Sequence, residues 1–505
     1  MDASFAMKCL IALPLFGSVI IYLGGRLVAR RFGESYERNP ACWLALAVLA
    51  ASAVALGFAA GPALAGNPVI WQVGTIFLVL DGIGLLLAVV VLGLSILVTL
   101  YSSRYMSGEV GEEKFYALLV AMAGTMIGLG CATDLFNLWV WFEAMAISSY
   151  MLVAFYRQQP SSLEAGVKYL VQSACGSVLV LLGIGLVFAQ TGTLNLAEIR
   201  MATSSGLPAV YLAAGALFLI GFGVKVALVP LHTWLPDAHS QAPSGISAML
   251  SGVVIEAGLI ALLRVLGSLA GASTSWGTIL LGFGAINMLL GNLMALRQEQ
   301  VKRLLAYSSI SHMGYILVGI GVAVGFSSQA GAAGAFFHIL SHAMMKGLAF
   351  LSAGAFMFVL YISRGSHNAL VKDDLNGAAA KYPLVAFVFS VALLGLGGLP
   401  PLAGFMSKWQ IFVGGFNTQN GWIMALMVFM ALNSVLSLGY YAPLVNLMYR
   451  KAPSEQVLAG KPLPWTIILP LVLLALAIVV LGFAPGLMDW LTVPAGQRLI
   501  GMFGN

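Results

Sequence analysis

Two charged residues, Lys225 and Glu256, lie inside apolar segments of a kind that normally carries no charge. Between them stand Pro230, Pro236 and Pro243, which forbid a continuous helix because proline lacks an amide hydrogen and clashes with the preceding turn. An ionisable group at membrane depth costs about 2.5–3.5 kcal/mol to insert, so we interpret it first as functional, facing a partner or water. The stretch therefore predicts membrane helices that are broken close to titratable groups.

Further titratable side chains lie in other apolar segments. Glu143 is surrounded by aromatic residues in the run DLFNLWVWFEAMAISSYMLVAF, and His312 lies in a second segment. In HILSHAMMKGLAFLSAG, His338, His342 and Lys346 recur every four residues, which places them on one face of a helix. Histidine titrates near neutral pH, so this face suits proton transfer. Fixed ion pairs that merely hold helices together are the alternative, and a zinc site is disfavoured because no glutamate stands at H-E-x-x-H spacing.

A second broken segment, LGLGGLPPLAGFMSKWQIF, contains Pro400 and Pro401 and is followed by Lys408. In the first break the lysine precedes the proline, and here it follows. Apolar spans interrupted by glycine and proline at matching places in two halves indicate inverted repeats in transporters. We therefore predict two inverted five-helix repeats, residues 115–265 and 275–450, each with one broken helix. Residues 1–114 would form three helices before them, and residues 451–505 a last one.

The composition predicts a polytopic membrane protein. Of 505 residues, 60% are hydrophobic and 8% are charged, whereas soluble proteins carry about 25% charged residues. The four cysteines show no CxxC spacing, so neither an iron–sulfur cluster nor a zinc site is expected in this chain. We expect an all-α fold with about 14 transmembrane helices, since a span needs about 20 apolar residues. The segments are roughly 8–28, 41–61, 78–101, 115–133, 135–156, 165–190, 208–230, 244–265, 275–296, 303–325, 331–361, 383–415, 421–449 and 464–489, with breaks expected in the eleventh to thirteenth.

The distribution of basic residues predicts the orientation. Basic residues collect in cytoplasmic loops of membrane proteins. Alternation of the spans puts only Lys8, Arg200, Arg264 and Arg498 outside, with both termini facing outward. This bias accounts for the net charge of +6 without a nucleic-acid partner. The absence of a transit peptide favours a bacterial or archaeal inner membrane. The residues assigned to the cytoplasmic side are Arg26, Arg30, Arg31, Arg38, Arg104, Lys114, Arg157, Lys168, Arg297, Lys302, Arg303, Arg364, Lys372, Lys381, Arg450, Lys451 and Lys461.

Four motifs resemble a known family. The run KVALVPLHTWLPDAHSQAPSGISAMLSG (225–252) is similar to the antiporter-like subunits of respiratory complex I, Mrp cation/proton antiporters and energy-converting membrane hydrogenases. The runs VKRLLAYSSISHMGYIL (301–317), HILSHAMMKGLAFL (338–351) and LPPLAGFMSKWQIF (399–412) follow in the family's order. The resemblance covers essentially the whole chain.

The resemblance implies roles for the buried charges. The residues that match Glu143 and Lys225 form the pair that gates proton movement in the first half-channel. Those that match His338, Lys346 and Lys408 belong to the central polar axis and the exit half. The resemblance also implies other membrane subunits as partners and no cofactor in this chain. Iron–sulfur clusters or flavin would lie in peripheral redox subunits.

Glu256 departs from the family pattern, which usually has a lysine at this position. A carboxylate there reverses the charge beside Lys225. It could bind Lys225, compete with Glu143, or coordinate Na⁺. The chain also ends soon after the last span, so it resembles the middle-type subunits without a long lateral helix, although Lys408 replaces the glutamate that one of them carries.

Three functions fit these observations. The first is a proton-translocating subunit of a redox-driven complex, of the complex I or hydrogenase type. The second is a subunit of an Mrp-type Na⁺/H⁺ antiporter, which Glu256 favours because carboxylates are better Na⁺ ligands than lysine. The third is a structural membrane subunit whose charges are fixed ion pairs.

Overall fold

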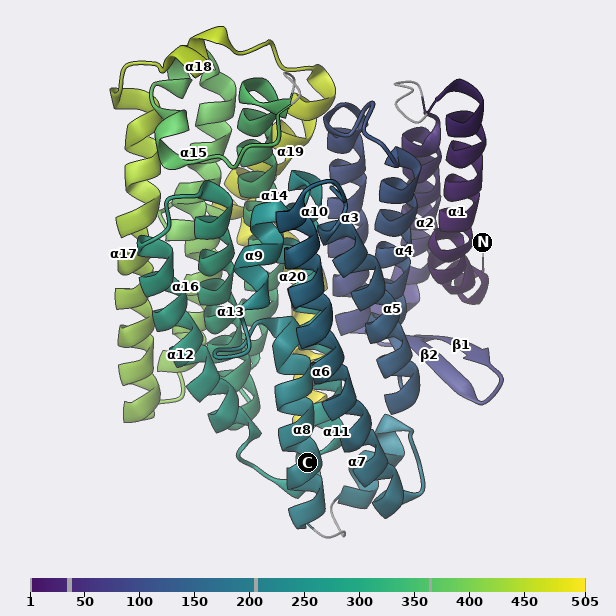
Figure 1. Cartoon of the computed structure of the whole chain (residues 1–505). Helices are drawn as coiled ribbons and strands as arrows, with labels where there is room; N and C mark the ends of the chain where they lie inside the picture. Colours follow the sequence, from purple (N-terminus) through teal and green to yellow (C-terminus); the bar gives the residue numbers. More distant parts are fainter. Residues whose placement is uncertain (1, 34–38, 204–207, 363–365, 505) are drawn as a thin grey trace.

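The computed structural model describes residues 2–33, 39–203, 208–362 and 366–504, and within them the protein is built almost entirely of helices (Figure 1). This confirms the predicted all-α class. Arg38 and Arg364 lie outside the described residues. Thirteen of the helices described are long and apolar enough to cross a membrane. The pair α15 (Pro383–Gly397) and α16 (Ala403–Phe416) replaces the predicted twelfth span. Together they agree with the expected 14 segments.

The long helices follow the predicted segments closely. Their bounds are α1 Ala3–Phe32, α2 Ala41–Leu64, α3 Gly82–Tyr105, α4 Glu112–Cys131, α5 Leu135–Val153, α6 Pro160–Thr191, α8 Pro208–Val226, α10 Ser244–Met249 continuing through η1 Leu250–Val254 into α11 Ile255–Ser268, α12 Trp276–Leu296, α13 Val301–Phe326, α14 Gln329–Leu360, α15 Pro383–Gly397, α16 Ala403–Phe416, α17 Gly421–Arg450 and α19 Trp465–Phe483. The shorter helices are α7 Leu196–Thr203, α9 Trp234–Gln241, α18 Glu455–Ala459 and α20 Asp489–Phe503.

Both predicted helix breaks are present. The chain leaves α8 after Val226 and resumes helix at Trp234, and it leaves α15 at Gly397 and resumes at Ala403. The breaks expected in the eleventh and thirteenth spans were wrong, because α14 and α17 are continuous. Segment α14 contains glycine but no proline, so no backbone donor is removed from its hydrogen-bond ladder.

Two elements were not predicted. Strands β1 Val69–Val73 and β2 Ile76–Leu80 pair antiparallel between α2 and α3. After α19 the chain turns at a short 3₁₀ segment, Pro485–Met488, and α20 packs back against α3 and α14. The final region is therefore the long helix α19, a turn and the shorter helix α20, where a single span was expected.

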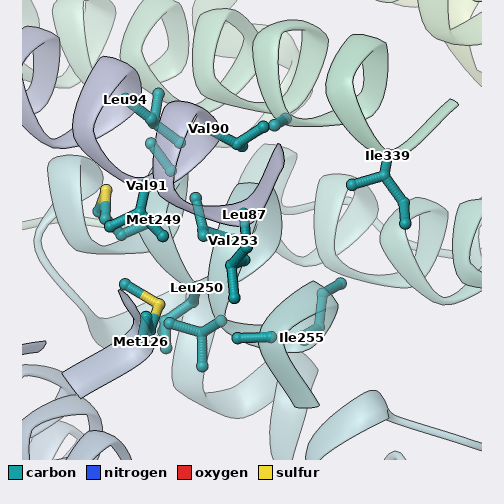
Figure 2. Packing of buried hydrophobic residues seen from close by; sticks show 14 of the residues in the cluster. Leu87, Val90, Val91, Leu94, Met126, Met249, Leu250, Val253, Ile255 and Ile339 are labelled. Carbon is teal, nitrogen blue, oxygen red and sulfur yellow. The ribbon is translucent and has the colours of Figure 1, made fainter. Parts of the chain in front are cut away.

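The run Ser244–Ser268 lies at the centre of the molecule and is buried along its whole length. Figure 2 shows apolar side chains from α3, α4, α14 and the α10–η1–α11 run gathered around it. Residues Leu250–Val254 form a π-helix directly before Glu256. Single π-turns within α-helices are frequent at functional sites. The labelled side chains are Leu87, Val90, Val91, Leu94, Met126, Met249, Leu250, Val253, Ile255 and Ile339.

Close backbone contact fixes the second break, and it makes Gly482 a sensitive position. A Cβ atom at Gly482 of α19 would overlap the carbonyl oxygen of Pro401. Overpacking of this kind costs about 1–3 kcal/mol. We expect Gly482→Ala to lower the apparent melting temperature of the detergent-solubilised protein. Gly57→Ala is the matched control, because a Cβ there meets no atom within 4 Å; equal melting temperatures for the two variants would contradict the packing argument.

Candidate functional site

Lys225 lies at the end of α8, where the helix breaks, and is almost wholly buried. Its Nζ donates to the Tyr169 hydroxyl at 2.7 Å and lies 4.6 Å from the centroid of that ring. The Tyr169 ring stacks on Trp234 of α9, with centroids 3.9 Å apart. A cation over an aromatic face is stabilised by the ring quadrupole. The segment after the break therefore holds the aromatic partner of Lys225 in place.

Glu143, on α5, is the expected partner of Lys225, but no ion pair within 4.0 Å joins these two described residues. Its Oε1 is buried and has no hydrogen-bond partner among the described residues. Lys225 turns instead toward Tyr169 and, at 3.5 Å, the Ser149 hydroxyl. The structure thus has the two members of the implied gating pair apart.

Glu256 does not face Lys225, contrary to one of the arrangements expected from the sequence. Its Oε1 shares a 2.7 Å hydrogen bond with His342 Nδ1, and both side chains are wholly buried. The contact with Lys225 comes from Gly258, where a Cβ would lie 2.9 Å from the lysine Cγ. Residues two positions apart lie on different faces of a helix, so Gly258 faces Lys225 on α8 whereas Glu256 faces His342.

The three histidines form a connected group. His312 of α13 stacks on His342, with ring centroids 5.2 Å apart, and its Nδ1 shares a 3.1 Å hydrogen bond with His338 Nε2. His338 Nδ1 in turn lies 2.8 Å from the Ser407 hydroxyl of α16. Hydrogen bonds thus join Glu256 to His342, and His312 to Ser407 of α16 through His338. The step from His342 to His312 is a ring contact, because His342 Nε2 has no hydrogen-bond partner among the described residues.

Lys408 follows Ser407 in the sequence and lies close to the second helix break. Its Nζ donates to the Leu396 carbonyl of α15 at 2.9 Å and to the Ser434 hydroxyl of α17 at 2.9 Å. The break after α15 leaves the last carbonyls of that helix without partners in the next turn, so they are available to a cation. Nζ also lies 4.5 Å from the centroid of the Tyr315 ring.

Lys346 shares a helix with His338 and His342 but bonds elsewhere. Its Nζ donates to the Leu305 carbonyl at 2.8 Å and to the Ser308 hydroxyl, both on α13. The three residues are buried along one side of α14, as the four-residue spacing predicted. The two histidines join the connected group, whereas Lys346 anchors α14 to the first half of α13.

The partner residues Tyr169, Ser149 and Ser434 were missed by sequence reasoning. They come from helices far from their lysines in sequence, and serine and tyrosine in apolar helices carry no distinctive pattern. Ser407 could have been found, since it directly precedes Lys408. Sequence reasoning also placed Lys302 in a solvated loop, but it is buried at the start of α13 and donates to the Ala242 carbonyl at 2.5 Å.

A buried ion cluster was also missed. Asp81 caps α3 by accepting from the Gly84 amide at 2.9 Å, as a residue at a helix start can. It also pairs with Arg264 and Arg498, which the sequence placed in outer loops. Arg264 is in fact buried within α11. Among the described residues no three His, Cys, Asp or Glu side chains are grouped as a metal site.

The family is decided by comparison with known proteins. A family model described as NADH:quinone oxidoreductase/Mrp antiporter, TM, matches residues 132–437. A second, described as NADH-Ubiquinone oxidoreductase (complex I), chain 5 N-terminus, matches residues 75–116. The chain belongs to this antiporter family. The resemblance inferred from the four motifs is thereby confirmed.

Similar members of the antiporter family are subunits of large membrane complexes. NADH-quinone oxidoreductase subunit N of Desulforudis audaxviator is 32% identical over 497 residues, which cover 94% of each chain. F(420)H(2) dehydrogenase subunit N of Methanosarcina mazei is 31% identical over 427 residues, 83% of this chain and 85% of that one. A chain of the archaeal membrane-bound sulfane sulfur reductase superposes with a TM-score of 0.86 at 28% identity, with 98% of each chain covered.

Proposed function

We propose that this chain moves protons across a bacterial or archaeal plasma membrane as one subunit of a redox-driven complex. The observation that supports the proposal most directly is the series of side-chain contacts from Glu256 through the three histidines to Ser407, which directly precedes Lys408 in the sequence. Such a series crosses from the centre of the molecule to the second helix break. The relatives named as oxidoreductase and dehydrogenase subunits favour a redox-driven complex. Residues 115–265 and 275–450 would form the two inverted repeats of this chain, and both of its termini would face outward.

In the first half, Lys225 alternates between two partners. In contact with Glu143 its ammonium group would be stabilised by an opposite charge, whereas beside Tyr169 its partners are the hydroxyls of Tyr169 and Ser149 and an aromatic face. Removing a counter-ion from a buried cation favours the neutral amine. Movement of Lys225 from Glu143 to Tyr169 would therefore release its proton toward the centre, and the return movement would load it again.

In the later part of the path, from Glu256 onward, the proton passes through groups that need not carry a net charge. Glu256 would take up the proton and become a neutral carboxylic acid, and it would then give the proton to His342. An imidazole can accept a proton on one nitrogen and donate one from the other, and the hydroxyl of Ser407 can do both on its single oxygen. Transfer from His342 to His312 would require a rotation of one ring, because His342 Nε2 has no hydrogen-bond partner among the described residues. Lys408 would be the last acceptor before the exit. Proton transfer through the carboxylic acid of Glu256 would thus take the place of the transfer between two lysines that is usual in the family.

Glu256→Gln tests this transfer. The amide retains a hydrogen bond to His342 but cannot take up or release a proton. We expect proton translocation to fall at least tenfold with little change in the amount of assembled complex. The measurement is proton uptake by inverted membrane vesicles. Glu256→Asp, which keeps a titratable group, is the control and should retain a larger share of activity; full activity in Glu256→Gln would remove Glu256 from the path.

An Mrp-type Na⁺/H⁺ antiporter subunit is the second candidate, because the matching family model includes Mrp antiporters and Glu256 offers a carboxylate. Mild-detergent purification of the tagged chain from native membranes separates the two. Subunits that hold flavin or iron–sulfur clusters support the redox-driven complex. A cofactor-free assembly of membrane subunits, together with Na⁺-dependent transport that Glu256→Gln abolishes, supports the antiporter.

A further inference from the structure

A cavity of about 330 Å³ lies apart from the proton path, at the ends of α11 and α20. Isolated β-bridges join β2 to the segment before α5, and that segment to the start of α7, so these elements form one wall. The cavity combines a cationic side with an apolar side. The cationic side consists of Arg200, Arg264 and Arg498, and the apolar side includes Ile70, Phe77, Val79, Leu196 and Met502.

Arg264 is the buried base of the cationic side. It donates to both carboxylate oxygens of Asp81, at 3.1 and 2.8 Å, and to the Gly130 carbonyl. Its side chain is 3% exposed. Its Nε is buried and has no hydrogen-bond partner among the described residues. A donor of a charged group that is left unpaired in a buried site calls for an acceptor.

The other two guanidinium groups are held in position by the protein. Arg498 donates from Nε to Asp81 at 2.9 Å, and none of the described residues accepts from its terminal nitrogens. Arg200 donates to the carbonyls of Gly501, at 2.5 Å, and Gly504 near the end of α20. Asp81 is the one acidic partner of this group among the described residues, so two positive charges remain uncompensated at the cavity.

Two residues of the apolar side are also exposed at the surface of the protein. Ile70 is 51% exposed and Phe77 is 39% exposed, and both belong to the β-hairpin. A free inorganic anion would gain nothing from such a wall, whereas a molecule with an anionic head and a hydrocarbon chain would contact both sides. Guanidinium groups bind phosphate oxygens through several parallel hydrogen bonds.

We propose that this cavity binds the phosphate group of an anionic phospholipid. The phosphate accepts from the terminal nitrogens of Arg498, with the charges of Arg264 and Arg200 beside it, and an acyl chain lies along the outer face of the hairpin over Ile70 and Phe77. The lipid would join α11, α20 and the hairpin, which are distant in sequence. This role is independent of proton transfer, since none of these residues is on the proposed path.

The test is made on the purified native complex. Native mass spectrometry counts the phospholipids that remain after detergent washing, and dioleoylphosphatidylglycerol, dioleoylphosphatidylcholine or inorganic phosphate is then titrated while the melting temperature is recorded. We expect phosphatidylglycerol to raise the melting temperature, and phosphatidylcholine and inorganic phosphate to have no comparable effect. Arg498→Gln should weaken phosphatidylglycerol binding at least tenfold. Arg450→Gln, at the exposed end of α17, is the control and should bind as the wild type does.

A second pair of variants separates charge from folding. Ile70→Glu places a negative charge on the exposed wall and should weaken phosphatidylglycerol binding, whereas the neutral Ile70→Gln should weaken it much less. Stabilisation by inorganic phosphate equal to that by the lipid would overturn the assignment to a phospholipid. Unchanged lipid binding in Arg498→Gln and Ile70→Glu would overturn the site itself. Loss of a partner subunit from Arg498→Gln with lipid binding intact would assign the cavity to that subunit instead.

Discussion

Replacement of Lys225 by methionine is expected to reduce proton translocation to less than a tenth of the wild-type rate, with assembly of the complex preserved. Methionine has a similar length and fills the same buried space beside Gly258 and Tyr169, so little packing is lost. It cannot carry a proton. The measurement is acidification of inverted vesicles, driven by the electron donor of the native complex or, for a cofactor-free assembly, by a sodium gradient.

Two comparisons make this result specific. Arg31→Gln removes an exposed charge whose expected role is orientation, and transport should be nearly unchanged. Tyr169→Phe keeps the ring over which Lys225 lies but removes the hydroxyl 2.7 Å from Nζ. Transport should slow without being abolished. Normal pumping by Lys225→Met would refute the gating role, and a complex that assembles but does not pump would exclude a purely structural subunit.

The second large effect concerns stability. Asp81→Asn leaves Arg264, 3% exposed, without its counter-charge. Breaking a buried ion pair by removing one partner typically costs about 3–5 kcal/mol, because the remaining charge stays buried. We expect a clear loss of folded protein, measured as the melting temperature and the yield after solubilisation. The double variant Asp81→Leu with Arg264→Met removes both charges and should be less destabilised than Asp81→Asn; the reverse order would contradict this account.

The same cluster predicts a response to pH. Burial alone raises the pKa of Asp81, but Arg264, Arg498 and the Gly84 amide more than offset it, so the pKa lies below the usual value for aspartate. A carboxyl whose pKa is lower in the folded state than in the unfolded state adds stability above the unfolded pKa. That stability is lost as the pH falls through the folded pKa. The cluster should therefore remain intact across the neutral and mildly acidic range.

The sequence was sufficient for the architecture because membrane helices leave a local signal. Hydropathy located nearly every long helix, and proline with glycine located both breaks. The β-hairpin and α20 were missed, since both are short and lie between or after apolar spans. For the candidate site, the predicted charged residues except the half-buried Glu143 are buried inside helices in the structure, and the sequence singled them out because a charge in an apolar helix is conspicuous.

The pairing of those residues was not predictable, because it depends on helix rotation. Glu256 was expected near Lys225, but α11 turns it toward His342 and presents Gly258 to the lysine. A rotation of α11 about its axis by the angle between two successive alternate residues would exchange Glu256 and Gly258 as the neighbour of Lys225. Arg264 was assigned to a loop since it ends an apolar run, and only its pairing with Asp81, 183 positions earlier, shows that it is buried.

The tight packing of Gly258 against Lys225 has a consequence for the cell's energy supply. A membrane that stores energy as a proton gradient cannot tolerate an open conductor through one of its proteins, because the gradient would discharge as heat. Here the backbone of α11 occupies the space beside the lysine, and on the histidine side the rings of His342 and His312 stack without a hydrogen bond between them. Such interruptions in the route act as a valve. It lets the protein do work on protons when helices move and keeps it from leaking when they are still.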